Sequence, residues 1–360
     1  MIALSMCIGL ALVLADDPKA AQSSTLTLWS SEEPMVGVFD ELTSQGVSLR
    51  FGQDIIPTLI PWYDVRELHP AVLGYTKYQQ VAHDLWRAHA RLARGDYFGA
   101  ESIYNAFEDE YLWTVGAQGA DVSMGLVRCR LDRNDRVHAV VPFLSWLGAS
   151  HSARSTDSKN DGSIFQGFDS KYGLIVALVP VFGPGDRGMA IGNDGDSSRI
   201  SGRQRMLYEY YTLALDHHSH RTPQAESALK EIQASVRELG KRDVGLALID
   251  EIVIAQAHPD PEKRTSARKS LERRVRASDG TWIELWARLA LGASMIAEHD
   301  AELNEQGVIE LIHIVVRLGH LSQPIAELAA QIANEYFIRT NRTQWGNELM
   351  LEAQAGWSND

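Results

Sequence analysis

Between residues 25 and 69, apolar and polar side chains alternate with a period of two. The clearest runs cover 25–29, 36–39, 47–51 and 55–60. This alternation is typical of β-strands that bury one face, and the intervening Gly46 and Gly52 favour turns. Pro57 and Pro61 suit strand ends, because proline cannot donate a hydrogen bond to a neighbouring strand. The pattern therefore predicts a small β module over 25–69.

After Pro70 the apolar positions recur with the period of an α-helix. Val81, Leu85 and Leu92 fall on one helix face, and Gly95 then interrupts the pattern before a second helix begins. We expect helix pairs over 71–149 and a helical array over 205–356. In the array, the predicted helices cover 205–217, 223–239, 244–257, 259–276, 282–298, 305–318 and 324–339. The predicted fold class is mainly α: an array of helical hairpins preceded by a small β-barrel-like module.

The first two helix pairs share a pattern that returns after 39 residues (134 − 95). Gly95 aligns with Asn134, Ala100 with Ala139, Tyr104 with Phe143, and Phe107 with Trp146. In each copy a turn former precedes a small residue, and two aromatic residues follow. A small residue lets two helices approach closely, while aromatic rings fill the groove between neighbouring pairs. The spacing therefore predicts a repeated helix–turn–helix unit.

One segment of this unit resembles a known repeat. Gly95, Tyr97, Ala100 and Tyr104 follow the Gly-x-Tyr-x-x-Ala-x-x-x-Tyr core of tetratricopeptide (TPR) repeats. The chain departs from that family in two ways: its period exceeds the usual value of about 34 residues, and the Trp-x-x-Leu of the first helix is out of register. The resemblance implies a TPR-like array that binds peptides or protein helices.

The front module resembles the small barrels of the SH3-like and Sm-like classes over 36–65. Sm-like barrels often bind RNA, but this chain lacks the basic patch that RNA binding requires. We therefore favour a structural or protein-interaction barrel. Three segments of the chain, 61–65, 91–97 and 282–289, are also similar to a group of uncharacterised exported bacterial proteins. That similarity implies export but no particular activity.

The first 15 residues form an uncharged apolar run that ends in Val13, Leu14 and Ala15. A run of this length before a small residue is typical of a signal peptide, and it is shorter than the roughly 20 residues of a membrane-spanning helix. We therefore expect a signal peptide over 1–15 and an exported protein, periplasmic or extracellular. No Lys or Arg precedes the run, which departs from the usual signal-peptide pattern, and a retained N-terminal anchor is the alternative.

Composition narrows the classes of partner. The net charge of −13 disfavours nucleic acids and anionic lipid surfaces. The hydrophobic fraction of 45% is ordinary for a folded protein. Beyond the signal peptide, Cys129 is the single cysteine, so no internal disulfide can form, and its apolar helix predicts a buried structural thiol. We expect a protein or peptide partner and no cofactor.

Residues 150–204 are predicted to form a linker and loop region. Within it, the apolar run 172–182 precedes a Gly-x-Gly-x-x-Gly pattern over 183–188, which is the letter pattern of a phosphate-binding loop. Pro180 is incompatible with a central parallel strand, and no helix follows to receive a phosphate. The sequence therefore favours a loop that connects helical layers.

The sequence contains no catalytic constellation, and its metal candidates are weak. His217, His218 and His220 cluster beside Asp216 and before Pro223. Imidazoles at this spacing are able to bind a metal, but a solvated helix end explains them more simply. The acidic run 108–110 also suits a solvated helix end. No cofactor-binding pattern is present.

Three functional hypotheses follow from these observations. The sequence favours a non-enzymatic interaction or scaffold protein of the cell envelope, because stacked helix pairs form extended binding surfaces. The alternative is an envelope-directed, hydrolase-like enzyme with a cleft near 183–220. The third hypothesis is a structural subunit of a larger assembly.

Overall fold

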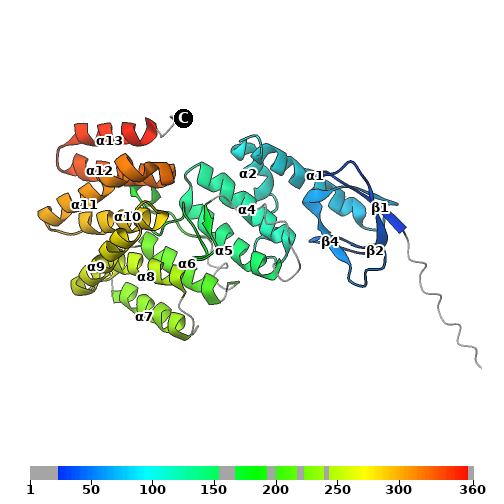
Figure 1. The fold of residues 1–360 in the computed structure, drawn as a ribbon, viewed down its shortest axis with the longest axis horizontal. Coiled ribbons are helices and arrows are strands. Elements are labelled where there is room, and N and C mark those ends of the chain that lie inside the picture. The colour runs from blue at the N-terminus through cyan, green and yellow to red at the C-terminus, as the bar shows by residue number, and fades with distance from the viewer. Residues whose placement is uncertain are drawn as a thin grey trace, which may run out of the picture. The chain divides into compact units, whose positions relative to one another are not determined.

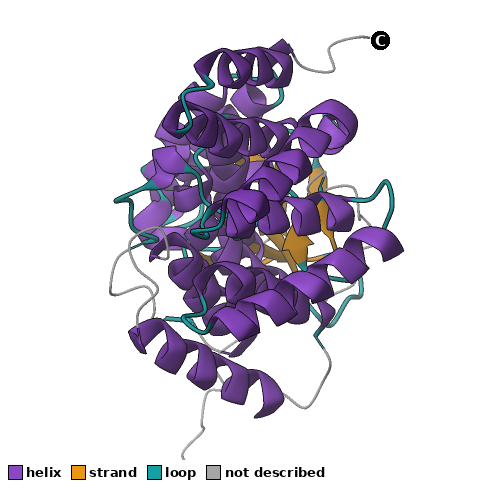
Figure 2. Ribbon diagram, turned by 90° about the vertical axis from the view of Figure 1, so that its left-hand side faces the viewer, coloured by secondary structure: helices purple, strands orange, loops and turns teal. Residues whose placement is uncertain are grey.

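The computed structural model describes residues 23–153, 167–192, 199–200, 202–216, 223–238 and 243–355. It confirms a mainly helical chain with a small antiparallel sheet near its front (Figure 2). The chain divides into two compact units, Met1–Arg87 and Ala88–Asp360. The signal peptide predicted over 1–15 lies outside the described residues. None of the described helices is both long and apolar enough to cross a membrane.

The first unit contains a five-stranded antiparallel sheet of order β4-β3-β2-β1-β5. Its strands are β1 (Ser23–Leu28), β2 (Met35–Thr43), β3 (Gly46–Arg50), β4 (Thr58–Pro61) and β5 (Val65–His69). A single 3₁₀ turn, η1 (Trp62–Asp64), joins the two edge strands β4 and β5. The pairing register shifts once between β1 and β5 and once between β2 and β3. Such irregularities bend strands, which lets a short sheet curl.

Aromatic residues close the core of the first unit. Trp62 is fully buried, and its indole N–H donates to the carbonyl of Thr43 at 2.9 Å. Its ring stacks on Tyr78, with 4.7 Å between the ring centroids. Trp29 stacks on Trp86 in the same way, at 4.1 Å. Tyr78 and Trp86 belong to helix α1 (Tyr75–Leu92), so the first part of this helix packs on the sheet.

Helices build the second unit as a series of antiparallel neighbours (Figure 1). They are α2 (Tyr97–Asn105), α3 (Glu108–Tyr111), α4 (Ala117–Asp132), α5 (Arg136–Ala153), α6 (Gly202–Asp216), α7 (Pro223–Glu238), α8 (Val244–Ala257), α9 (Pro261–Ala277), α10 (Trp282–Ile296), α11 (Ala301–His313), α12 (Gln323–Arg339) and α13 (Thr343–Ala355). The helices α4 and α5, α10 and α11, and α12 and α13 form contacting pairs. A π-helical turn, Ile314–Leu318, extends α11.

The same tight turn links α1 to α2, α4 to α5 and α12 to α13. Gly95, Asn134 and Asn341 each end a helix with a positive φ, of 75°, 57° and 59° respectively. In each turn, the next residue donates its backbone N–H to a carbonyl of the preceding helix, as Asp135 does to Arg130 at 2.8 Å. This left-handed helix end favours glycine and asparagine over other residues. The turn explains why these two residue types align in the predicted repeat.

The small position and the first aromatic position of the predicted repeat are buried in both copies, whereas at the second aromatic position Trp146 is buried and Phe107 is only partly buried. Ala100 and Ala139 are fully buried, as are Tyr104 and Phe143. The ring of Tyr104 packs so closely on Gly125 of α4 that a Cβ there would approach it within 2.3 Å. A small residue on one helix therefore admits an aromatic ring from its neighbour.

Candidate functional site

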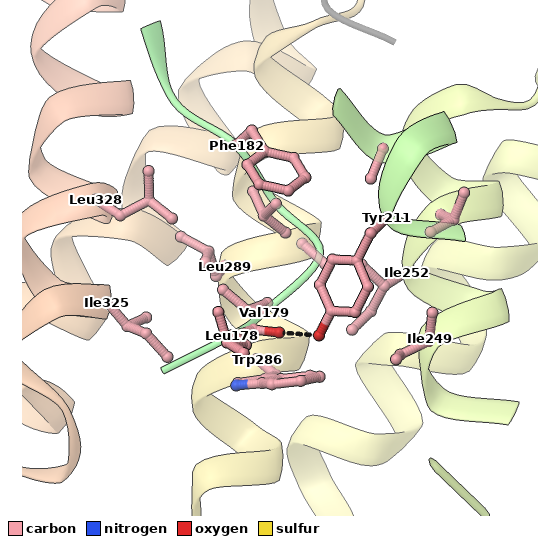
Figure 3. Packing of buried hydrophobic residues seen from close by; sticks show 14 of the residues in the cluster. Leu178, Val179, Phe182, Tyr211, Ile249, Ile252, Trp286, Leu289, Ile325 and Leu328 are labelled. Carbon is pink, nitrogen blue, oxygen red and sulfur yellow. Dashed lines mark hydrogen bonds between the residues drawn. The ribbon is translucent and has the colours of Figure 1, made fainter. Parts of the chain in front are cut away.

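An extended segment passes through the inside of the helical array. Residues 172–183, called here the strap, follow strand β6 (Phe168–Asp169) and include strand β7 (Leu174–Ile175), which pairs with β6 in a short two-stranded sheet. Every residue from 178 to 183 is buried. Figure 3 shows the strap between side chains of α6, α8, α10 and α12. The sequence predicted a loop between helical layers here, and the structure places that loop in the hydrophobic core.

Side chains of four helices donate hydrogen bonds to backbone carbonyls of the strap. The donors are Arg136 of α5, Arg203 and Tyr211 of α6, Gln256 of α8 and Trp286 of α10. Trp286 donates to Val176 at 2.7 Å, and Gln256 to Pro180 at 3.1 Å. Because a buried carbonyl without a partner is costly, these donors make burial of an irregular segment possible.

Apolar packing completes the contact between strap and array. Leu178, Val179 and Phe182 interleave with apolar side chains of the surrounding helices (Figure 3). Gly183 packs against Leu328 of α12, where a Cβ would lie only 2.8 Å from the leucine side chain. Burial also raises the pKa of the Tyr211 phenol, which keeps its proton available for the strap carbonyl of Leu178. The inner face of the array is therefore occupied by the chain itself.

The glycine-rich pattern over 183–188 forms a 3₁₀ turn, Pro184–Asp186, at the end of the strap. The Asp186 carboxylate accepts the backbone N–H of Gly183 at 2.7 Å and pairs with Arg136 at 2.8 Å. Burial lowers the pKa of Arg136, whereas Asp186 raises it. The Asp186 carboxylate thus already accepts a backbone N–H of this glycine-rich turn. In a phosphate-binding loop, backbone N–H groups of this kind donate to the phosphate.

The second unit also contains a cavity of about 480 Å³. Its polar wall consists of Glu108, Asp109, Arg130, His138 and Arg199. Leu112 and Val141 supply an apolar part of the wall, and Ala190 and Gly192 contribute backbone. The volume falls within the range of roughly 300–1,000 Å³ that is common for small-molecule sites. Part of the wall comes from the region 183–220, where the sequence placed the cleft of the alternative enzyme.

Arg130 organises one side of the cavity. It is 9% exposed, and it donates to both carboxylate oxygens of Glu108 at 2.9 and 3.0 Å. A further donor of Arg130 reaches the carbonyl of His138 at 2.9 Å. Glu101 lies 3.5 Å from the guanidinium. Glu108 is therefore the partner of a buried arginine, so the interpretation of 108–110 as a solvated helix end is wrong for Glu108.

His138, another residue of the cavity wall, is held by a carboxylate. Its Nδ1 lies 2.8 Å from an oxygen of Asp135, the residue just before α5. Such a carboxylate fixes the orientation of an imidazole and leaves Nε2 for another contact. Half of the His138 side chain remains exposed, at 51%. The pair is thus positioned for binding or for proton transfer.

The structure describes only some of the candidate residues named from the sequence. His217, His218 and His220 lie outside the described residues. No group of three or more possible metal-ligating side chains occurs in the part of the chain that the structure describes. Cys129 is buried as predicted, and burial raises the pKa of its thiol to about 12, which makes it a poor nucleophile.

Other residues of the site were not recognised from sequence. Arg130 and His138 line the cavity from the neighbouring helices α4 and α5, whereas Arg199 comes from a much later segment, and no short motif connects the three. Trp286 is fully buried among the helices, and its indole N–H also donates to a carbonyl of the strap. Comparison of the chain with protein-family models, curated proteins and solved structures gives no match.

Proposed function

We propose that this chain is an exported protein-interaction or scaffold protein of the cell envelope, with a TPR-like helical array behind an SH3-like or Sm-like module. The observation that carries the proposal is the strap. The array holds an extended segment through five side chains that donate to its carbonyls and through apolar packing. Recognition of an extended peptide by a rigid surface depends on the same two kinds of contact. The apolar run over 1–15 supports export.

Local geometry supports the two resemblances. The recurring turn at Gly95, Asn134 and Asn341 is followed five residues later by a small buried residue, namely Ala100, Ala139 and Gly346. In the front module, the meander, its strand irregularities and the turn η1 between the edge strands support a curled barrel. Neither resemblance depends on an enzymatic site.

A partner would bind outside the occupied inner face. Exposed apolar side chains on the last helix pair include Trp345, which is 57% exposed, and Leu351, which is 65% exposed. Leu349 on the same helix is 9% exposed and belongs to the core. These three positions provide a test and its control on one helix.

The test is photo-cross-linking in cells. A photoreactive residue replaces Trp345 or Leu351 in the tagged protein, and the cross-linked material is purified and identified by mass spectrometry. We expect one stoichiometric protein partner from an exposed position and none from the matched variant at Leu349. Recovery of the protein alone, from both exposed positions and from chemical cross-linking of the unmodified chain, would remove the scaffold proposal.

A second candidate function is an envelope-directed hydrolase. The pair of Asp135 and His138 at the cavity favours it, because an imidazole oriented by a carboxylate is a common general base. The experiment is a hydrolysis screen of the purified protein against envelope peptides and glycans. Any activity found should disappear in His138→Ala and persist in a matched variant of the exposed His83, outside the cavity.

A further inference from the structure

The outer face of α13 combines exposed apolar side chains with exposed carboxylates. Trp345 is 57% exposed and Leu351 is 65% exposed, and Glu348 and Glu352 on the same helix are exposed as well. Successive residues of an α-helix turn by about 100° around its axis. Both carboxylates therefore fall between the two apolar side chains on one side of the helix. These four residues are called here the α13 patch.

The opposite face of α13 fixes the helix to the array. Leu349 belongs to the hydrophobic core, and Gly346 packs so closely on α12 that a Cβ there would overlap the Asn334 side chain. The Trp345 ring meets Phe337 of α12 edge-on, with 5.9 Å between the ring centroids. The patch thus lies on a packed helix, so a partner need not order it on binding.

The charge of the α13 patch is negative throughout. The helix contains no Lys, Arg or His, and neither do residues 356–360, which follow it in the sequence. Glu348 accepts a hydrogen bond from Gln344 at 2.8 Å, and no ion pair joins Glu348 or Glu352 to a described residue. A partner with positive charge is complementary to these carboxylates and meets no cation on the helix itself.

An arginine at the border of the patch is already committed elsewhere. The Arg342 guanidinium lies over the Trp345 ring, 5.5 Å from the ring centroid, and pairs with Glu305 at 2.7 Å. The contact shows that this ring accepts a cation on its face, as Trp does better than other aromatic residues. Lys or Arg of a partner therefore suits both the ring and the carboxylates.

The spacing within the patch suits an α-helical partner. Trp345, Glu348 and Glu352 follow one another at i, i+3 and i+7, the spacing that lines one face of a helix. In the array, α12 packs on α11 and α13 packs on α12 (Figure 1). A helix with apolar residues at the same spacing can pack on α13 as the next layer, with its ridges in the grooves of α13. Basic residues beside that apolar stripe then reach the carboxylates.

Two other occupants are disfavoured by charge. A second copy would have to offer a helix that is both basic and apolar on its exposed side. Among the described helices, α9 has the most Lys and Arg, but it exposes no large apolar side chain. Packing of α13 against its own copy would bring carboxylates together. An anionic lipid surface is repelled by the same carboxylates.

We propose that the α13 patch binds a basic amphipathic helix of a partner protein. The apolar face of that helix lies on Trp345 and Leu351, and its Lys or Arg side chains pair with Glu348 and Glu352. This inference rests on the proposed interaction function and names the chemistry of the partner. It requires no covalent step.

The test is titration of the purified full-length protein into a fluorescent peptide, followed by anisotropy. The basic peptide repeats the heptad Leu-Lys-Ala-Leu-Lys-Lys-Ala, and the matched acidic peptide has Glu in place of every Lys. The salt concentration is about 0.15 M, which screens charges that lie more than about 8 Å apart. We expect the basic peptide to bind with a dissociation constant of about 100 μM or lower, and the acidic peptide about tenfold or more weakly.

Two variants connect the binding to the patch. Trp345→Ala should weaken binding of the basic peptide about tenfold or more, as expected of a Trp at the centre of an interface. The double variant with Glu348→Lys and Glu352→Lys should reverse the preference between the two peptides, because it changes attraction into repulsion. The melting temperature of each variant shows whether it folds.

Each variant has a matched control on another helix. Phe98→Ala removes an exposed aromatic ring from α2, where Phe98 is 73% exposed. The double variant with Glu231→Lys and Glu262→Lys changes the net charge as much as the patch variant does, but on the exposed sides of α7 and α9. Both controls should keep the affinity and the preference of the wild-type protein.

The inference is overturned by absence of binding, by equal affinity for the two peptides, or by unchanged affinity in folded Trp345→Ala. An equal loss in the charge control would show general attraction to an acidic protein, and dimers that Trp345→Ala dissociates would assign the patch to a second copy. A partner captured by photo-cross-linking together with any of these outcomes would leave the scaffold proposal standing. Recovery of the protein alone, with discriminating peptide binding, would remove the scaffold proposal and leave the patch as a binding site. The two proposals can therefore fail separately.

Discussion

The space between the helices that holds the strap is called here the groove. The groove and the cavity are two recesses of the second unit, and they differ in how their polar groups are used. In the groove, donors such as Trp286 and Gln256 are already bound to strap carbonyls. In the cavity, Arg199 and Asp109 have no described partner, although Arg130 and Glu108 satisfy each other. The groove therefore contributes stability, whereas the cavity wall contains two charged side chains with no ion pair to a described residue.

The first turn of α5 contributes side chains to both recesses. Arg136 at the start of α5 donates to the strap carbonyl of Val181 at 3.0 Å. His138, two residues later, faces the cavity. Residues two apart on a helix do not share a face, so adjacent positions can serve unrelated purposes. The comparison predicts that substitutions in the groove will lower stability, whereas substitutions of exposed cavity residues will leave it almost unchanged.

The largest effect should come from Trp286→Ala, which empties the centre of the groove. The side chain is fully buried, and its loss also leaves the carbonyl of Val176 without this donor. We expect the free energy of unfolding to fall by about 3–5 kcal/mol, measured by chemical denaturation. Trp345→Ala is the control, because that ring is 57% exposed and should cost much less. Equal losses for both variants would contradict the assignment of the strap to the core.

A smaller effect is expected from Tyr211→Phe. This change keeps the ring and removes only the hydroxyl that donates to the strap carbonyl of Leu178. Leaving a buried carbonyl unpaired should cost about 1–3 kcal/mol in the same denaturation experiment. Tyr208→Phe offers a comparison, since its hydroxyl donates to Ile191 beside the cavity and is only partly buried. If Tyr211→Phe left the free energy of unfolding unchanged, the strap would not need this donor.

The turn before α5 should show an effect of similar or smaller size. Asn134→Ala places an alanine at a φ of 57°, and we expect a loss of about 1–2 kcal/mol in unfolding free energy. Gly95→Ala, in the matching turn at a φ of 75°, should lose a comparable amount. Asn134→Gly should be tolerated better than Asn134→Ala. If alanine were neutral at both sites, the turns would not depend on the left-handed conformation.

The smallest effect on stability should come from the cavity. Arg199→Gln is expected to change the free energy of unfolding by less than about 0.5 kcal/mol, because the side chain is exposed and no ion pair joins it to a described residue. Thermal denaturation of the variant beside the wild-type protein measures this directly. A large loss would show that Arg199 is structural and would weaken the contrast between the two recesses.

Local pattern predicted the helices better than the strands. The predicted helix 244–257 coincides with α8, whose start is fixed by Asp243 accepting the N–H of Leu246. Strand β5 was missed because its buried residues, Val65 and Leu68, lie three apart. The register shift in its pairing with β1 breaks the period of two, so the segment does not show the usual alternation.

Most of the candidate site could not be predicted from the sequence, because its residues come together only when the chain folds. The strap appears in the sequence as an apolar run, and periodicity alone does not distinguish a buried loop from a buried strand. Arg130 offered one usable signal, since it lies among the buried apolar residues of α4. A charge in such a place requires a partner, but Glu108 is 22 residues away and only tertiary packing identifies it.

The strap also changes how the array should unfold. Repeat arrays of helix pairs depend mainly on contacts between neighbours, and their ends can open separately. Here one segment contacts side chains of α5, α6, α8, α10 and α12, which are far apart in sequence. Loss of any one of these helices exposes the strap to water and weakens the rest. We therefore expect the second unit to melt as a single cooperative body rather than pair by pair.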